Sequence, residues 1–285
     1  MRIIDYLLRL KSGLGYPGKG FIIAGLVILI PLILMAILAP AISPYDPTKG
    51  SRDTLQPPSF KHFFGTNNLG QDLFSRILWG GRVVLTVVLV STLLSAAVGI
   101  PLGLISGYLG GRIDRALAMI MDSIYAFPGL ILAIALASVL GPSIINAAAA
   151  IAVVYIPTYF RMTRGPTLQL KASQYVEAAI ATGAPTRRII FRHILPNLTP
   201  TLTVVFTLNT ADSILTEAGL SFLGFVVTPP TPDWGFDLKA GQPFLPAGYW
   251  WLITFPGIFI ILLSLGFGLL GEGLNELLSP KEKTM

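Results

Sequence analysis

The residues that most closely resemble a known binding motif form a glycine-rich run near the start of the chain, Gly13-Leu14-Gly15-Tyr16-Pro17-Gly18-Lys19-Gly20. Glycine loops of this kind bind nucleotide phosphates through their backbone amides. A P-loop ends in Ser or Thr, whose hydroxyl holds magnesium, but Gly20 stands at that position. The βαβ unit of a dinucleotide-binding loop is also missing, because an apolar segment follows the run. We therefore interpret the run as a flexible leader and expect no nucleotide site in it.

Two histidines and the absence of cysteine limit the metal chemistry open to the chain. His62 and His193 are far apart in the sequence and lack the spacing of metal ligands. Without cysteine there are no disulfides, iron–sulfur clusters or thiolate zinc sites. The sequence also lacks a G-x-S-x-G nucleophile elbow and an H-E-x-x-H motif. We expect no catalytic residue, no metal site and no cofactor in this chain.

Four polar side chains stand inside otherwise apolar runs: Asp122, Asn209, Asp212 and Glu217. A carboxylate in lipid is costly, so these groups should face the interior of a helix bundle, a partner or an aqueous path. Asp212 and Asn209 lie deep in their run, whereas Glu217 lies near its outer end, where water reaches. The alternative is that they are packing contacts between helices. These four residues are our candidates for the wall of a translocation path.

A further candidate runs from Glu177 to Pro196, in the most basic internal segment of the chain. Glu177 supplies one anionic group, and the small Ala178 and Ala179 allow a partner backbone to approach closely. Gly183 suits the left-handed residue that follows the end of a helix. An amphipathic hairpin resting on lipid headgroups would explain the basic charge, but not the acid followed by two alanines. We therefore predict a docking surface for a partner protein.

Two short helices are expected in this stretch. Ser173 is a candidate N-cap for the first, over 174–182, and Pro185-Thr186 begins the second, which Pro196 ends at the membrane. The second helix carries the basic residues Arg187, Arg188 and Arg192.

The composition sets the environment of these candidates. Hydrophobic residues make up 53% of the 285 residues and charged residues only 12%, whereas soluble domains average about 25% charged residues. Much of the surface is therefore expected to face lipid. The net charge is +6, but the charges cluster between apolar runs, which indicates the positive-inside bias of membrane proteins rather than binding to nucleic acid.

Six apolar runs are long enough to cross a membrane, at 21–42, 83–108, about 116–140, 144–160, about 198–222 and 250–270. We interpret 21–42 as a retained membrane helix, because it is longer than the apolar part of a signal peptide. The segments between and beside them are a leader (1–20), a loop (43–82) with a short amphipathic helix at 71–79, a basic loop (161–197), a second polar loop (223–249) and a tail (272–285). Gly99, Gly103 and Gly107 share one helix face, which either lets another helix approach closely or has no packing role.

The distribution of Lys and Arg predicts the orientation. With both termini inside, fourteen of the twenty basic residues lie inside and six outside. The loop 161–197 is then cytoplasmic, and the loops 43–82 and 223–249 are external.

The pattern Glu177-Ala178-Ala179, Gly183 and Leu195-Pro196 resembles the E-A-A motif in the cytoplasmic loop of the permease subunits of bacterial and archaeal ABC importers. The segment 65–76 resembles the G-T-D-x-x-G-R-D-x-x-S-R motif of dipeptide, oligopeptide and nickel permeases, with Asn67 and Gln71 in place of the usual Asp and Arg. The segments 107–114, 127–129, 217–224 and 233–235 also match. Together they are similar to the C-type permease subunit.

The resemblance implies an all-α membrane protein with the type I ABC importer permease fold, six transmembrane helices, both termini in the cytoplasm of a bacterium or archaeon, and a core of five helices over 83–271. It implies a second, homologous permease, two ATPases that bind ATP and magnesium, an external binding protein that delivers di- or oligopeptides, and no enzymatic activity in this chain. The coupling loop 161–197 would contact an ATPase. Its proposed coupling residues are Glu177, Ala178, Ala179, Gly183, Arg187, Leu195 and Pro196.

Three alternatives remain at this point. The same machinery serves nickel or glutathione in related systems, and the subunit motifs do not separate these substrates. A channel or scaffold that works without an ATPase would lack a use for the E-A-A stretch. A membrane enzyme would need catalytic residues that the sequence does not show.

Overall fold

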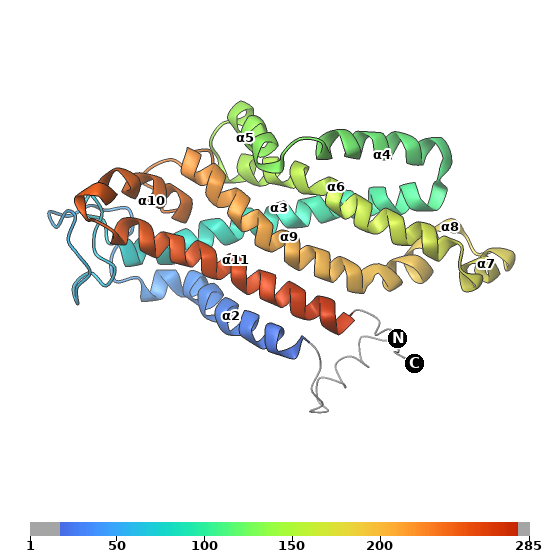
Figure 1. Cartoon of the computed structure of the whole chain (residues 1–285), viewed down its shortest axis with the longest axis horizontal. Helices are drawn as coiled ribbons and strands as arrows, with labels where there is room; N and C mark the ends of the chain where they lie inside the picture. Colours follow the sequence, from blue (N-terminus) through green and yellow to red (C-terminus); the bar gives the residue numbers. More distant parts are fainter. Residues whose placement is uncertain (1–17, 279–285) are drawn as a thin grey trace.

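The computed structural model describes residues 18–278, which form a bundle of helices drawn out along one axis (Figure 1). The predicted leader and tail therefore lie mostly outside the described residues. Residues 18–278 contain no strand, only an isolated bridge between Thr66 and Asp72. The main helices are α2 (Lys19–Ile42), α3 (Leu73–Leu109), α4 (Gly111–Tyr125), α5 (Gly129–Leu140), α6 (Ile144–Lys171), α7 (Gln174–Ala181), α8 (Thr186–Arg188), α9 (Leu195–Leu223), α10 (Trp234–Gly241) and α11 (Trp251–Leu278).

Five helical segments in this part of the chain are long and apolar enough to cross a membrane, and the bent pair α4 and α5 makes a possible sixth. The pair covers the third predicted run at 116–140 and adds a bend that the sequence analysis did not predict, because the two helices meet at 89°. Pro128 lies at the break between them. The proline ring disfavours helical geometry in the preceding residue, so the helix ends before it and restarts in a new direction.

The start of α3 also differs from the prediction. The segment 71–79 is not a separate amphipathic helix, because α3 begins at Leu73 and continues for 37 residues without a break. Asp72 caps the helix by accepting a hydrogen bond from the amide of Ser75 at 2.8 Å. No proline or glycine turn occurs between Leu73 and Pro101. The helix therefore continues across the predicted boundary between residues 82 and 83.

The packing of α3 against α6 depends on the predicted glycine face. A Cβ atom on Gly99 would lie 2.6 Å from the Cβ of Tyr159, and one on Gly103 would lie 2.6 Å from the carbonyl oxygen of Phe160. A Cβ atom on Gly107 would lie 2.8 Å from the carbonyl oxygen of Arg164. The three glycines therefore hold the two helix backbones in close contact, as small residues do in membrane bundles.

The helical path from Thr186 to Leu223 is continuous, and this corrects the predicted stop at Pro196. It runs through α8, the π-helical segment η1 (Ile189–Ile194) and α9. Pro196 is the second residue of α9 and closely follows the π-helical segment η1, so the irregular turn falls where the proline has no N–H to donate. The coupling loop is therefore joined to the fifth span by an unbroken helical rod.

The segments fall at two ends of the bundle (Figure 1). The start of α2, the end of α11 and the loop with α7 and α8 lie at one end. Residues 43–72, together with α10 and the start of α11, lie at the other end, and we call residues 43–72 and 224–250 the cap. This arrangement places the predicted inside segments together and separates them from the two predicted external loops.

Candidate translocation cavity and coupling loop

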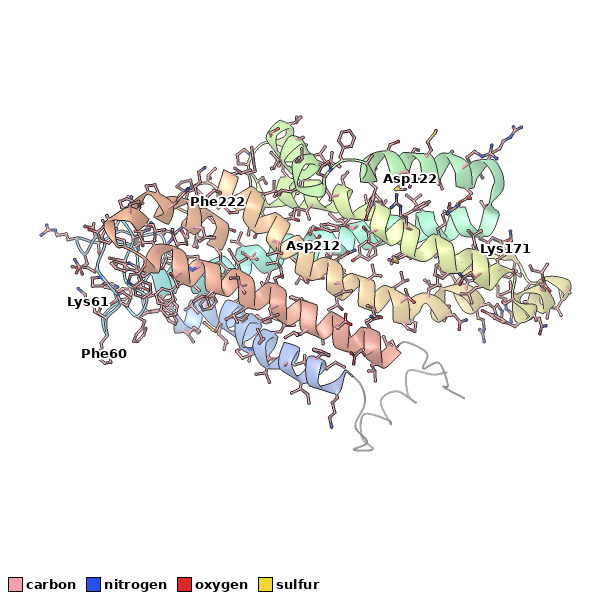
Figure 2. The ribbon with its side chains drawn as sticks, in the orientation of Figure 1. Phe60, Lys61, Asp122, Lys171, Asp212 and Phe222 are labelled. Carbon is pink, nitrogen blue, oxygen red and sulfur yellow. The ribbon has the colours of Figure 1, made fainter. Side chains whose placement is uncertain are left out.

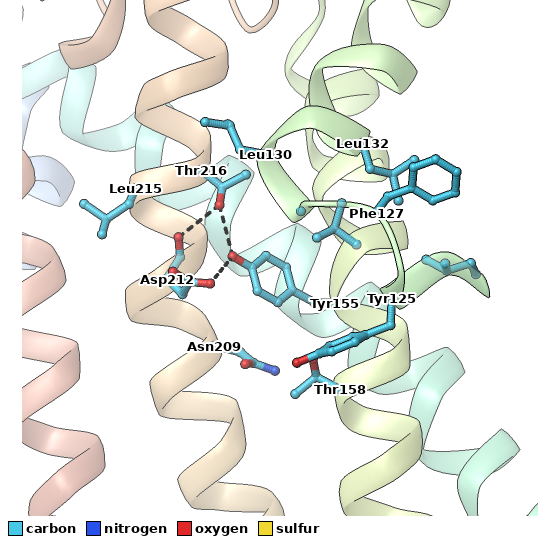
Figure 3. A pocket seen from close by; sticks show the side chains of 13 residues that line it. Tyr125, Phe127, Leu130, Leu132, Tyr155, Thr158, Asn209, Asp212, Leu215 and Thr216 are labelled. Carbon is cyan, nitrogen blue, oxygen red and sulfur yellow. Dashed lines mark hydrogen bonds between the residues drawn. The ribbon is translucent and has the colours of Figure 1, made fainter. Parts of the chain in front are cut away.

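A cavity of about 660 Å³ opens between α4, α5, α6 and α9 (Figure 3). Its polar wall comes from one face of α9, where Asn209, Asp212 and Thr216 follow at helical spacing. Tyr155 and Thr158 of α6 face them across the cavity. The remaining lining residues are mainly apolar or aromatic: Ile124, Tyr125, Phe127, Gly129, Leu130, Leu132, Val154 and Leu215. The bend after α4 brings Tyr125 and Phe127 to this cavity, which a straight third span would not.

Hydrogen bonds hold the acid of this cavity in place. The hydroxyl of Tyr155 donates to Oδ2 of Asp212 at 2.6 Å and lies 3.0 Å from the hydroxyl of Thr216 (Figure 3). The Thr216 hydroxyl also donates to the backbone carbonyl of Asp212 at 3.2 Å. Asn209 lies one turn away, with its Nδ2 buried and without a hydrogen-bond partner. The structure therefore brings together Asn209 and Asp212, two of the four residues predicted to line a path.

Asp122 lies outside this cavity. It lines a neighbouring hollow between α4 and α6 with Asp114 and Arg164. Its carboxylate forms an ion pair with Arg161 at 2.6 Å, and this guanidinium lies 4.0 Å from the ring centroid of Tyr125. Arg164 binds Asp114 in the same way through two nitrogens, at 2.5 and 2.7 Å. These two ion pairs tie α4 to α6.

Glu217 is fully buried, which corrects the expectation that water reaches it, while its place in a translocation path stays a prediction. It does not line the cavity, and its carboxyl interacts with that of Asp233, at the start of α10. Neither of its oxygens has a hydrogen-bond donor in the described chain. The packing of α10 against α9 closes the space that the sequence alone left open to water.

Asp233 itself is held by several donors. Its Oδ1 accepts hydrogen bonds from the hydroxyl of Ser221 and from the amides of Gly235 and Phe236, at 2.9 and 3.1 Å to the amides. Burial raises the pKa of Asp233, while the bonds from Ser221 and the two amides act in the opposite direction. The carboxyl therefore serves as the N-cap of α10 and as the neighbour of Glu217.

At the other end of the bundle, α7 is anchored by a single small core. Val176 is buried with Ile189, Ile194, Leu198 and Leu104, which come from η1, α9 and α3. The remaining faces of α7 are open, and Glu177 and Ala178 are exposed while Ala179 is half-buried. Ser173 stands at the N-cap position without a side-chain capping bond, because its hydroxyl donates to the carbonyl of Leu170 instead.

The end of α7 has the predicted glycine turn. Gly183 has φ +75° and its amide donates to the carbonyl of Ile180, while the next amide, of Ala184, donates to Ala179 at 3.0 Å. This pair of bonds is a Schellman motif, in which a left-handed glycine closes the helix. A Cβ atom on Gly183 would touch nothing within 4 Å, so the glycine is there for its backbone conformation.

The exposed face of the coupling loop is unusually rich in large apolar side chains. Tyr175 is 43% exposed, Ile180 47% and Phe191 60%. Arg187 and Pro196 are exposed, and Leu195 is half-buried. Apolar residues grouped with charged ones on a projecting helix pair are typical of a protein interaction site.

The cap contains a buried ion pair that the sequence analysis missed. Arg76 of α3 binds Asp237 of α10 through Nε and Nη2, at 2.9 and 2.7 Å. Both side chains are at most 5% exposed. The cap is the end of the molecule at which Figure 2 labels Phe60 and Lys61. Nη1 of Arg76 donates to the carbonyls of Pro47 and Pro230 and to Oε1 of Gln71. The only sequence signal was the Ser75-Arg76 match to the permease motif.

The two departures from that motif contact each other. Nδ2 of Asn67 donates to Oε1 of Gln71 at 2.8 Å, and Oδ1 of Asn67 accepts the backbone amide of Gln71 at 2.9 Å. A neutral amide pair therefore stands where the motif places Asp and Arg. The same Oε1 accepts from Arg76, which joins this turn to the buried ion pair.

Metal chemistry has no site in the part of the chain that the structure describes. No three His, Cys, Asp or Glu side chains of residues 18–278 gather at ligand distance. His62 is buried, with Nδ1 2.8 Å from Oδ1 of Asp72, and His193 lies in the distant coupling loop. His62 therefore has a structural role within the cap.

A bundle of membrane-length helices with a polar cavity is the architecture expected of a membrane transport subunit. The chain belongs to the family of binding-protein-dependent transport system inner membrane components, whose model matches residues 99–284. Residues 21–58 match a second model, the N-terminal transmembrane domain of oligopeptide transport permease C. It is a permease subunit of an ABC importer and not an enzyme, because this family consists of transport subunits.

Named relatives cover most of the chain. It is 41% identical to the dipeptide transport system permease protein DppC of Alkalihalophilus pseudofirmus, over 92% of this chain and 86% of that protein. It is also 41% identical to the glutathione transport system permease protein GsiD of Pectobacterium atrosepticum, over 92% of this chain and 87% of that protein. Among solved structures, an inward-facing MetNI methionine ABC transporter matches with a TM-score of 0.58 and 18% identity, over 72% of this chain and 97% of that one. This match confirms the predicted type I importer permease fold.

Proposed function

We propose that this chain forms one half of the membrane path of an ATP-driven importer of di- or oligopeptides. A second, homologous permease would complete the path, two ATPases would each dock at the coupling loop of one permease, and an external binding protein would deliver the peptide to the cap. The observation that carries the substrate class is the 41% identity to a dipeptide permease over 92% of the chain. The transporter would lie in the cytoplasmic membrane of a bacterium or archaeon.

The geometry of the coupling loop supports the ATPase contact. Glu177, Ala178 and the apolar Ile180 project from α7, whose own anchor is the buried Val176. Docking of a partner against this face would press on α7, and the continuous helix from Thr186 to Leu223 would carry the movement to Asp212 in the cavity. ATP and magnesium would bind to the partner ATPases and not to this chain.

Glutathione is the second candidate substrate, because the glutathione permease of Pectobacterium atrosepticum is as similar to this chain as the dipeptide permease is.

The test is uptake by the complete transporter. This chain, its partner permease, both ATPases and the binding protein would be reconstituted into proteoliposomes, and uptake of labelled dialanine and glutathione would be measured with and without ATP. We expect ATP-dependent uptake of dialanine. Uptake of glutathione without uptake of dialanine would make glutathione the substrate. Uptake that needs no ATP would favour a channel.

A further inference from the structure

The cavity between α4, α6 and α9 has an uneven charge. Among its thirteen lining residues, Asp212 is the only one with a charged side chain. The aromatic residues Tyr125, Phe127 and Tyr155 also line the cavity (Figure 3). Tyr125 is 52% exposed and Phe127 59%. No lysine, arginine or histidine lines this cavity. The wall that this chain provides is therefore suited to a cation and not to an anion.

The carboxylate of Asp212 is oriented but not neutralised. Oδ2 accepts the hydroxyl of Tyr155 at 2.6 Å, which fixes the rotamer. Oδ1 has no donor among residues 18–278, and the side chain is exposed to the cavity. Because a carboxylate at membrane depth is costly without a partner, this arrangement calls for a positive group from outside the described chain.

The neighbouring cations are already paired. Arg161 lies about one turn along α6 from Thr158, but its guanidinium binds Asp122 at 2.6 Å and lies over the ring of Tyr125. Arg164 binds Asp114. Asp212 forms no ion pair in the described structure, whereas the other two acids on this side of the bundle each have one.

We propose that Asp212 binds the free α-ammonium group of the peptide as it passes through the cavity, with the ring of Tyr155 beside it. This inference rests on the proposed import function. An ammonium group has three donors and no acceptor, so it fits one carboxylate oxygen together with electron-rich ring faces. The carboxylate end of the peptide finds no positive partner among the residues that line this cavity. A bare divalent metal would need several such ligands, and the cavity has one.

Asp212→Asn separates charge from shape. The asparagine oxygen can still accept the Tyr155 hydroxyl, so the local hydrogen bond remains while the negative charge is lost. In the reconstituted transporter we expect the rate of dialanine uptake to fall about tenfold, the usual worth of one charge-assisted hydrogen bond. Asp212→Glu should restore part of the rate. Glu272→Gln, which removes an exposed carboxylate on α11, should leave the rate unchanged.

A direct binding measurement identifies the group that is recognised. Saturation-transfer NMR would compare dialanine with N-acetyl-dialanine on the transporter without its binding protein, which removes the preference of that protein. We expect the wild type to bind the free amine about tenfold better than the blocked one, and Asp212→Asn to bind both equally.

Equal binding of the two peptides by the wild type would overturn the inference. So would dialanine uptake by Asp212→Asn at the wild-type rate, while the proposed peptide import would stand. If the wild-type transporter took up no peptide at all, the proposed function would fail together with the inference. Glutathione also carries a free ammonium group, and the separate uptake measurements with dialanine and glutathione show which source the transporter uses.

Discussion

The cap and the coupling loop treat their polar and apolar groups in opposite ways. In the cap, Arg76 is buried with an acid and three further acceptors from four separate segments. In the coupling loop, Glu177 and Arg187 are exposed, and large side chains such as Phe191 face outward. The network around Arg76 satisfies its own groups, whereas the coupling loop offers them to a partner.

This difference matches the mechanical roles that we propose. A closed network fixes α3, α10 and residues 43–72 as one unit, so the cap can receive a force without deforming. The coupling loop is fixed to the bundle mainly through the small core around Val176, but it continues as a rigid helix into α9. The predictions below test the contrast from the largest expected effect to the smallest.

The largest effect is expected from Arg76→Met. The change leaves Asp237 buried and unpaired, which typically costs about 3–5 kcal/mol. We expect little folded protein and a much lower Tm of the purified chain in detergent. The double variant Arg76→Met with Asp237→Leu should recover part of this loss, because no charge is then left unpaired. A wild-type Tm for the single variant would show that the cap does not depend on this network.

The next effect concerns Gly183→Val in the coupling loop. A side chain at φ +75° costs about 1–2 kcal/mol, so the turn after α7 should distort while the bundle stays folded. We expect ATP-driven uptake to fall by about tenfold or more, the ATPases to remain active, and the Tm to change little. Gly248→Val is the matched control, since Gly248 is also left-handed, with φ +91° and the same open surroundings, in a turn of the cap. Equal loss of uptake from both variants would mean that backbone strain, rather than the coupling loop, is responsible.

A smaller effect of the opposite sign is expected from Asp233→Asn in the cap. The pKa of the buried Asp233 is raised, so the wild type gains stability where this carboxyl is protonated and loses it as the pH rises through the folded value. Asparagine keeps the acceptor for Ser221 and the helix cap, and its amide can donate to Glu217. At neutral pH we expect the Tm to rise by a few degrees, with the difference shrinking as the pH falls. A lower Tm at neutral pH would show that the negative charge at Asp233 is required.

The smallest effect is expected from Asp46→Asn at the edge of the cap. Hydrogen bonds from Thr48 lower the pKa of Asp46 from 3.8 to about 2. Its contribution is therefore present above pH 3.8 and is lost as the pH falls toward 2. Because the group is exposed, solvent screens it, and we expect the same Tm for variant and wild type at pH 7. A clear difference at pH 7 would mean that the exposed rim of the cap matters as much as its buried network.

The sequence was sufficient for the features that depend on local pattern. The apolar runs, the helix at α7 and the left-handed Gly183 follow from length, charge and backbone preference, and the structure agrees with each of them. The close contact of α3 and α6 at Gly99 also follows, although the sequence left a second interpretation open.

The errors arise where distant segments decide the outcome. Glu217 looked accessible because its burial depends on α10, which the sequence gives no means of placing. Arg76 and Asp237 are 161 residues apart, so no local pattern pairs them. The size of the bend at Pro128 does not follow from the sequence, because a proline in a membrane helix is compatible with a kink or with a complete break.

The contrast between the two ends is tested most directly by crosslinking from single cysteines. The natural chain has no cysteine, so Ala178→Cys in the coupling loop and Phe60→Cys, at a fully exposed position of the cap, each provide one unique attachment point. Both variants would be assembled with the partner permease and the ATPases, labelled with a maleimide benzophenone, irradiated and analysed by mass spectrometry. We predict an adduct with an ATPase subunit from position 178 and none from position 60. No ATPase adduct from 178, or equal yields from both positions, would contradict the assignment of the coupling loop as the docking site.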